Sequence, residues 1–142
     1  MARRLIPQLT YTWEHMGFGS LSPGIRDLVT RLTRDYGLVT PGPEIGVQFV
    51  HDVWSRDDGG QARAAKLATL LETLGPGTWV MVEHAATDTP EIRAFGHPGY
   101  EGVAADRSAV LAAWTSADVK AVIARRGIVL NNYREILAQR SR

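Results

Sequence analysis

The stretch that decides the fold is GQARAAKLATLLETLGPGTWVMVEH, residues 60–84, in which a helical pattern gives way to a strand pattern. Its apolar residues first recur at the spacing of an amphipathic helix, at positions 67, 70, 71 and 74. A Gly-Pro-Gly sequence then ends the helix. TWVMVEH, residues 78–84, is nearly continuously apolar before its last two residues, as expected for a strand covered on both faces. The stretch therefore predicts a helix and then a buried strand, with Glu83 and His84 at the strand's C-terminal end.

The alternation of helix and strand extends toward the N-terminus. Residues 8–15, QLTYTWEH, are rich in threonine and aromatic side chains, and they predict a strand that runs into a loop. Residues 22–37 predict an amphipathic helix with Ser22 as its N-cap, a proline at its first position and Gly37 as its stop. The IGVQFVHDVW run that follows lies between Pro/Gly and Asp/Gly clusters, which predicts a short strand or a structured loop.

The alternation also extends toward the C-terminus. Residues 103–115 and 116–127 predict two consecutive helices, the second with Ser116 as its N-cap and Gly127 as its stop. Residues 128–133, IVLNNY, predict a final strand, and a short helix follows in REILAQR. Helices that alternate with strands are typical of an α/β protein with parallel strands, so we expect the fold class to be α/β.

Length and composition predict a single globular domain over residues 1–142. Hydrophobic residues at 44% and charged residues at 22% are proportions typical of such a domain. The 16 basic and 15 acidic residues form no basic stripe, so we expect neither nucleic acid nor a membrane surface as a partner. The N-terminus lacks a signal-peptide pattern, and no window approaches the roughly 18 apolar residues of a membrane span. These patterns predict a cytoplasmic location.

The absence of cysteine narrows the chemistry. It excludes disulfides, thiolate metal sites and a cysteine nucleophile, so any metal would need histidine and carboxylate ligands. The sequence contains no GxSxG, P-loop, HExxH or dinucleotide-binding pattern, which removes support for a serine hydrolase, a nucleotide-binding protein or a zincin.

The chain has four histidines, and two of them close predicted strands. His15 ends the first predicted strand and His84 ends the strand at 78–84. Ligand sites in parallel α/β folds gather at the C-terminal ends of the strands, which favours both as site residues. The alternative for each is an ordinary hydrogen-bonded surface or core histidine. His51, inside an apolar run, is expected to be structural.

The polar segment VEHAATDTPE adds three carboxylates to His84, at Glu83, Asp88 and Glu91. Together they offer enough donors for metal binding or acid/base chemistry. The alternative is a polar loop with a helix N-cap at Thr89, directly before a proline.

Two other polar segments carry alternatives as well. In EHMGFGS, the glycines after His15 either leave its imidazole open to a ligand or form a strand-to-helix turn in which the histidine is incidental. Asp57 and Asp58, the adjacent aspartate pair in the chain, precede a predicted helix, and we expect them to cap it.

The order of these motifs resembles that of a known family. In residues 76–136 a predicted strand ends in a histidine, and a loop follows it. TSADVKAVI then has the pattern of a helix, and RGI leads to a last predicted strand that is followed by REI. TYTWEHMG, residues 10–17, is similar to a THxDSHMG segment, and DLVTRLTRDYGL is similar to the helix after it. In this order the motifs resemble those of YdjC-like carbohydrate deacetylases, which include chitooligosaccharide deacetylases and hopanoid-associated relatives.

The resemblance implies a partial distorted (β/α) barrel of the polysaccharide-deacetylase type. It also implies a divalent metal, zinc or magnesium, held by an aspartate and two histidines at the strand ends, where an activated water attacks the N-acetyl carbonyl of an amino sugar. By position, His15 matches a metal-ligand histidine of the family. His84 matches the histidine that ends the late strand, and it would act as the general acid.

The FGHPGYEG loop, residues 95–102, has the character of a family loop. Its two inner glycines and its proline shape a turn. On the same resemblance Tyr100 would pack or stack on the sugar, and His97 would be a second candidate for substrate contact.

The chain also departs from the family pattern. The family's N-terminal aspartate pair has no counterpart, and Tyr11 and Trp13 stand where the family often has histidine and aspartate. A complete barrel needs about 250 residues. The chain therefore resembles the C-terminal half or somewhat more of a deacetylase.

Two hypotheses follow from the match and the departures. In the first, the chain is a metal-dependent carbohydrate N-deacetylase that works with a missing N-terminal half or with another chain. In the second, it is a truncated, catalytically inactive relative that binds sugar or acts as an interaction domain. A half-barrel exposes strand edges and apolar surface, which favours a homo-oligomer.

Overall fold

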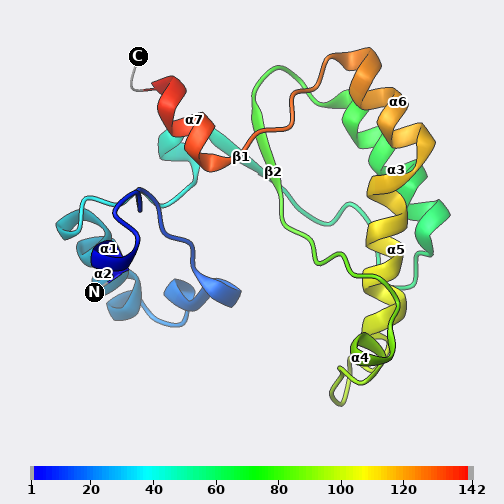
Figure 1. Ribbon diagram of the computed structural model, residues 1–142, viewed down its shortest axis with the longest axis horizontal. Coiled ribbons are helices and arrows are strands. Elements are labelled where there is room, and N and C mark those ends of the chain that lie inside the picture. The colour runs from blue at the N-terminus through cyan, green and yellow to red at the C-terminus, as the bar shows by residue number, and fades with distance from the viewer. Residues whose placement is uncertain (1, 141–142) are drawn as a thin grey trace. The chain divides into compact units, whose positions relative to one another are not determined.

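The computed structural model describes residues 2–140, and they form two compact units (Figure 1). The smaller unit comprises Met1–Val47 with Asn131–Arg142, and the larger unit comprises Gln48–Leu130. The single domain over residues 1–142 stays a prediction.

The larger unit combines a small sheet with helices. Strand β1 (Val47–Val50), which enters the unit at Gln48, pairs with β2 (Thr78–Met81) in a two-stranded parallel sheet. The helices of this unit are α3 (Gly60–Thr73), α4 (Pro90–Arg93), α5 (Val103–Thr115) and α6 (Ala117–Arg126). The fold is thus mixed α/β and mostly helical, which confirms the predicted class at this coarse level.

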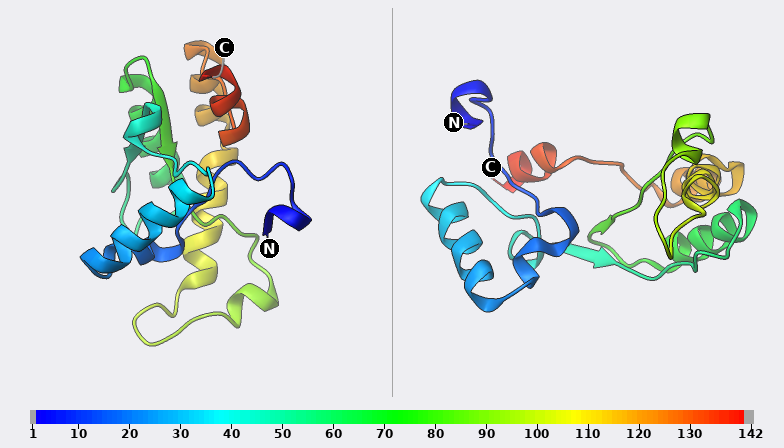
Figure 2. Two further views of the ribbon diagram at one scale, coloured as in Figure 1. Left: turned by 90° about the vertical axis from the view of Figure 1, so that its left-hand side faces the viewer. Right: turned by 90° about the horizontal axis from the view of Figure 1, so that it is seen from below.

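The core of the larger unit lies where α3 packs against α5 and α6, as the views in Figure 2 show. Leu67 of α3, Ala113 of α5 and Val119 of α6 are completely buried. The indole side chains of Trp54 and Trp114 pack against this cluster from its edge. Burial of these apolar side chains is the main force that holds the three helices together.

The start of α4 and both ends of α6, in the larger unit, carry the caps expected from the sequence. Ser116 Oγ accepts a hydrogen bond from the Val119 N–H at 3.2 Å, and Gly127 ends α6 in the left-handed region at φ 63°. Thr89 caps α4, where its Oγ1 accepts from the Ile92 N–H at 3.4 Å. These contacts confirm the predicted caps.

The smaller unit contains α1 (Ala2–Leu5), η1 (His15–Ser20), α2 (Pro23–Asp35), η2 (Pro43–Ile45) and α7 (Tyr133–Arg140). Ser22 caps α2 as predicted, because its Oγ accepts from the Ile25 N–H at 3.3 Å. The Tyr133 ring lies 5.2 Å from the Tyr11 ring and stacks at 5.9 Å on that of Trp13, centroid to centroid. These aromatic contacts connect the two chain segments of the unit.

Two predicted strands do not form. In residues 8–15, Tyr11 makes a single parallel bridge to Val39, and His15 already begins η1. Residues 128–132 have no regular secondary structure; Val129 is 75% exposed and Leu130 is 71% exposed. A strand needs a neighbour for its backbone N–H and C=O groups, and β-propensity alone does not supply one.

The prediction that the strand at 78–84 is covered on both faces is also wrong. Strand β2 ends at Met81, and all of its residues are half-buried. In the described part of the chain, β2 belongs to a sheet of two strands, which leaves part of its surface open. Within residues 2–140, no helix has the length and apolar character that crossing a membrane requires.

Candidate active site

The segment after β2 carries the first predicted site residues. Val82, Glu83 and His84 are exposed directly beyond Met81, where the strand ends. The segment is held against α5, because the Ala86 N–H donates to the Arg107 carbonyl at 3.2 Å. Glu83 and His84 thus follow the C-terminal end of a parallel strand.

A buried arginine organises the polar groups nearby. Arg63, in the first turns of α3, is 1% exposed and donates five hydrogen bonds. It contacts the carbonyl oxygens of Ser55, Arg56, Asp58 and Asp106, and the Asp106 carboxylate. One side chain therefore joins the loop before α3 to the first turn of α5.

Asp106 connects this arginine to the FGHPGYEG loop. Its Oδ1 accepts from Arg63 Nη2 at 2.6 Å, and its Oδ2 accepts from the Tyr100 hydroxyl. Burial has the largest single effect on Asp106 and acts to raise its pKa, but the hydrogen bonds from Tyr100 and Arg63 lead to a net lowering of the pKa. Asp106 is therefore a carboxylate held in its charged form.

The loop itself brings His97 and Tyr100 together. Their backbones exchange hydrogen bonds, with the Tyr100 N–H 2.8 Å from the His97 carbonyl oxygen, and their ring centroids lie 5.9 Å apart in an edge-on arrangement. Gly99, at φ 87°, supplies the conformation that this tight turn requires. His97 is exposed, whereas Tyr100 is half-buried.

The Tyr100 ring is contacted on one face by a cation. The Arg56 guanidinium carbon lies 4.6 Å from the ring centroid, and Arg56 Nη1 donates to the Gly99 carbonyl at 3.4 Å. Burial, followed by the hydrogen bond to Asp106, raises the pKa of the Tyr100 hydroxyl above its usual value of 10.0. The Tyr100 hydroxyl therefore keeps its proton and donates a hydrogen bond to the Asp106 carboxylate.

Glu83 belongs to the same electrostatic neighbourhood. Partial burial of its carboxyl raises its pKa above the usual 4.5; Arg63 acts to lower the pKa and Asp106 acts to raise it. A carboxyl that holds its proton more tightly is better suited to give and take protons near neutral pH. The charge of Asp106 therefore acts both on Glu83, after β2, and on Tyr100 of the FGHPGYEG loop.

His15 belongs to the smaller unit, whereas the other predicted site residues belong to the larger unit. It is exposed at the start of η1, where Met16 and Gly17 both adopt the left-handed conformation. The neighbouring Glu14 carboxylate accepts a hydrogen bond from the Gly19 N–H. That bond closes the turn, so Glu14 has a structural role beside His15.

The described residues do not form a metal site on their own. Within residues 2–140 no group of three or more histidine, aspartate or glutamate side chains is placed to hold a metal ion. A stable metal site needs about three or four donor atoms. His15 supplies one donor, so it could hold a metal ion only together with ligands from elsewhere.

The predicted capping role of the aspartate pair is wrong. Asp58 Oδ2 accepts from the Ser55 N–H at 2.8 Å and from Lys66 Nζ at 2.5 Å, while the N-cap position of α3 is Gly59, with no side-chain cap. The pair stands one residue too early for the cap. Asp58 instead closes the turn that carries the carbonyls contacted by Arg63.

Sequence reasoning did not single out Arg63, Asp106 or Arg56. A signal for Arg63 exists, because it stands four residues before Leu67 and eight before Leu71, on the buried face of α3. An arginine on an apolar face requires buried partners, although the pattern does not identify them.

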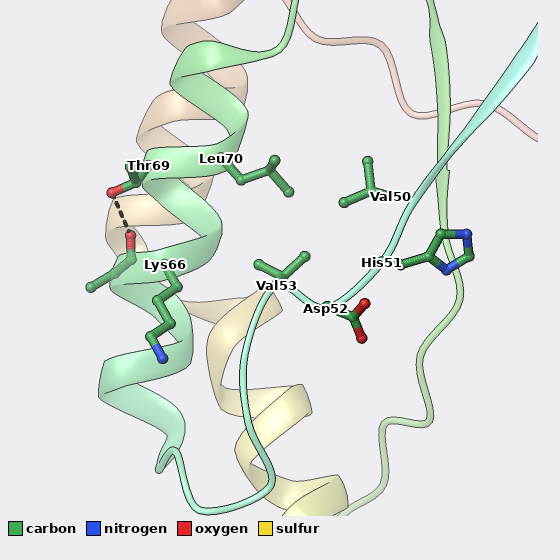
Figure 3. A pocket seen from close by; sticks show the side chains of 8 residues that line it. Val50, His51, Asp52, Val53, Lys66, Thr69 and Leu70 are labelled. Carbon is green, nitrogen blue, oxygen red and sulfur yellow. Dashed lines mark hydrogen bonds between the residues drawn. The ribbon is translucent and has the colours of Figure 1, made fainter.

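A hollow of about 540 Å³ lies elsewhere in the larger unit, between the segment after β1 and α3. Figure 3 shows Val50, Val53 and Leu70 pointing toward it, whereas the His51 imidazole points away from α3. His51 stacks on Phe49, with ring centroids 5.8 Å apart. The hollow contains none of the predicted site residues.

Comparisons of the chain with protein-family models, with curated proteins and with solved structures gave no match. The likeness to the YdjC-like deacetylases therefore stays a prediction.

Proposed function

We propose that the chain is part of a metal-dependent carbohydrate N-deacetylase that hydrolyses the N-acetyl group of an amino sugar or oligosaccharide. The fold that accompanies this proposal is a partial (β/α) barrel, in which β1, α3 and β2 would form one strand–helix–strand repeat. The observation that carries the proposal is that Tyr100 donates a hydrogen bond to Asp106, whose charge also acts on the carboxyl of Glu83, next to His84 in the chain.

His84 would protonate the amine that leaves when the amide bond breaks. It is exposed, as a group that meets a soluble sugar must be, and it follows Glu83, whose pKa is raised by partial burial. An imidazole can both accept and donate a proton at its ring nitrogens, which suits this role. His97 is exposed on the neighbouring loop, and with Tyr100 it would contact the sugar.

The metal would require ligands from a second segment or chain. His15 would contribute one donor, and the described residues hold no group of three. The alternative function, a sugar-binding or interaction domain without catalysis, is favoured by the same incomplete donor set. A sugar-binding domain and a deacetylase would both bind the amino sugar, but only the deacetylase would hydrolyse it.

The test is an assay of acetate release from diacetylchitobiose with added zinc or magnesium, paired with sugar binding measured by saturation-transfer NMR. His84→Ala should abolish acetate release, whereas the control His51→Ala, outside the proposed site, should retain it. Binding without acetate release would support the inactive sugar-binding domain. Absence of sugar binding would contradict the sugar-binding domain. Absence of acetate release also from a form joined to a segment that supplies the missing metal ligands would contradict the deacetylase.

The metal ligand is tested separately by titration with zinc chloride, followed by calorimetry. His15→Ala should weaken zinc binding relative to the wild type, and His51→Ala should not. Equal affinities in the three proteins would contradict the assignment of His15.

A further inference from the structure

Arg63 reaches Tyr100 by two separate routes. On one route its Nη2 donates to Asp106 Oδ1, and Asp106 Oδ2 accepts from the Tyr100 hydroxyl. On the other, its Nη2 donates to the Arg56 carbonyl at 3.0 Å, and the Arg56 guanidinium lies over the Tyr100 ring. The two routes hold the tyrosine at its hydroxyl and at its ring face.

These contacts bridge segments that are far apart in the sequence. Arg63 and Asp106 are separated by 43 residues, and so are Arg56 and Gly99. The Arg56 contact to the Gly99 carbonyl adds a direct link to the turn that carries His97 and Tyr100. The loop is therefore contacted from two sides, by Asp106 of α5 and by Arg56 from the segment before α3.

We propose that Arg63 and Asp106 are a positioning pair that sets the orientation of Tyr100, and with it the FGHPGYEG loop, beside the segment after β2. The proposal assigns to these residues a role that rests on the proposed function, because the loop would contact the sugar. Neither residue touches the substrate in this scheme.

The chemistry of burial supports a role beyond stability. Burying an arginine–aspartate pair costs desolvation energy that apolar residues of similar volume would not incur. Arg63 occupies a position on the buried face of α3 where an apolar side chain would pack against the same core. The pair contributes directional hydrogen bonds, which apolar side chains could not form. These bonds specify one arrangement of the 55–58 loop, α5 and Tyr100.

The first test uses Asp106→Asn in the full chain, with the Tyr100 hydroxyl followed by NMR of ¹³C-labelled tyrosine. Its resonance is identified by comparison with Tyr100→Phe. Loss of the carboxylate charge should lower the pKa of Tyr100, since the bond to Asp106 raises it. A folded variant whose Tyr100 titrates as in the wild type would overturn the proposal.

The second test measures amide hydrogen exchange in residues 95–102. Arg63→Lys and Arg56→Met should each accelerate exchange at the Tyr100 N–H by about tenfold, the scale of one lost hydrogen bond. Arg125→Lys is the matched control, because it alters an exposed ion pair with Glu72 in the same unit and should leave the loop unchanged. If Arg63→Lys and Asp106→Asn do not fold, Tyr100→Phe keeps the test decisive, because it removes only the hydroxyl that donates to Asp106. Unchanged exchange at the N–H of residue 100 in Tyr100→Phe would then overturn the proposal.

These readouts do not depend on turnover. A Tyr100 pKa that falls in Asp106→Asn supports the positioning pair even if the wild type releases no acetate from diacetylchitobiose. Conversely, acetate release together with an unchanged Tyr100 would overturn the pair and leave the proposed function standing.

Discussion

Gly60 on α3 lies so close to α5 that a Cβ on this glycine would stand 2.7 Å from the Cβ of Ala112. The same position would lie 3.6 Å from the carbonyl oxygen of Ala109. The two helices approach each other here because neither carries a larger side chain. The contact lies beside the turn from which Arg63 reaches Asp106, so it also supports the proposed positioning pair.

Gly60→Ala is expected to destabilise the protein, although alanine is the better helix former. Helix propensity would favour the change by up to about 1 kcal/mol. Overpacking against Ala112 should cost about 1–3 kcal/mol and outweigh it. The measurement is urea unfolding followed by circular dichroism.

The matched control is Gly24→Ala, also in the first turn of a helix, where nothing lies within 4 Å of the added Cβ. It should leave stability unchanged or raise it. Equal effects of the two substitutions would contradict the close approach of α3 and α5.

Leu67→Ala should cost about 2–5 kcal/mol of unfolding free energy, because it opens a cavity in the core of the larger unit. Leu67 is completely buried, whereas Leu130, the control, is 71% exposed. Leu130→Ala should change stability by less than about 0.5 kcal/mol. Tryptophan fluorescence reports on this core, since Trp54 and Trp114 border it. Similar losses of unfolding free energy in Leu67→Ala and Leu130→Ala would contradict the assignment of Leu67 to the core.

Ser116→Ala should destabilise α6 by about 1 kcal/mol, because the Val119 N–H would lose its side-chain acceptor. Ser116→Asp restores an acceptor and adds a negative charge at the helix N-terminus, so it should recover most of the loss. Thermal unfolding of the three proteins compares them directly. A variant with aspartate that is no more stable than the one with alanine would argue against the cap.

Glu83→Gln should raise the melting temperature at pH 7 and have a smaller effect as the pH falls. Partial burial raises the pKa of Glu83 in the folded protein above its usual 4.5. At pH values above the pKa of Glu83 in the unfolded chain, the ionised carboxylate therefore lowers the stability of the folded state. Below about pH 4.5 the carboxyl is protonated in both states and the cost disappears.

The control is Glu91→Gln, for which the sign is opposite. A hydrogen bond from the Thr89 hydroxyl lowers the pKa of Glu91, so its charge stabilises the folded state above its unfolded pKa. This substitution should lower the melting temperature at pH 7 or leave it unchanged. A gain for Glu91→Gln equal to that for Glu83→Gln would contradict the assignment of partial burial to Glu83.

The longer helices, and the caps of α2, α4 and α6, were predictable because the interactions that specify them are local. Ser22, Thr89 and Ser116 each accept from an N–H three residues ahead, and Gly127 supplies the left-handed residue at a helix end. The same local information failed at 128–133, where β-branched residues stand in a segment that finds no strand partner in the described structure.

The candidate site was predictable only in its exposed parts. Glu83, His84, His97 and Tyr100 stand out because polar side chains gather at a strand end and in a glycine-rich loop. Arg63 and Asp106 do not stand out, since their bond joins residues 43 positions apart. Local patterns extend over one or two helical turns and carry no information on such a pairing.

The amino-acid sequence alone thus establishes where the helices lie, how they end, and the mixed α/β class, because each depends on side chains within a few residues. Which strands find partners, and how Asp106 comes to join the buried Arg63 to Tyr100, depends on contacts between distant segments. Those contacts become favourable only when α3 and α5 pack and exclude water from the groups between them.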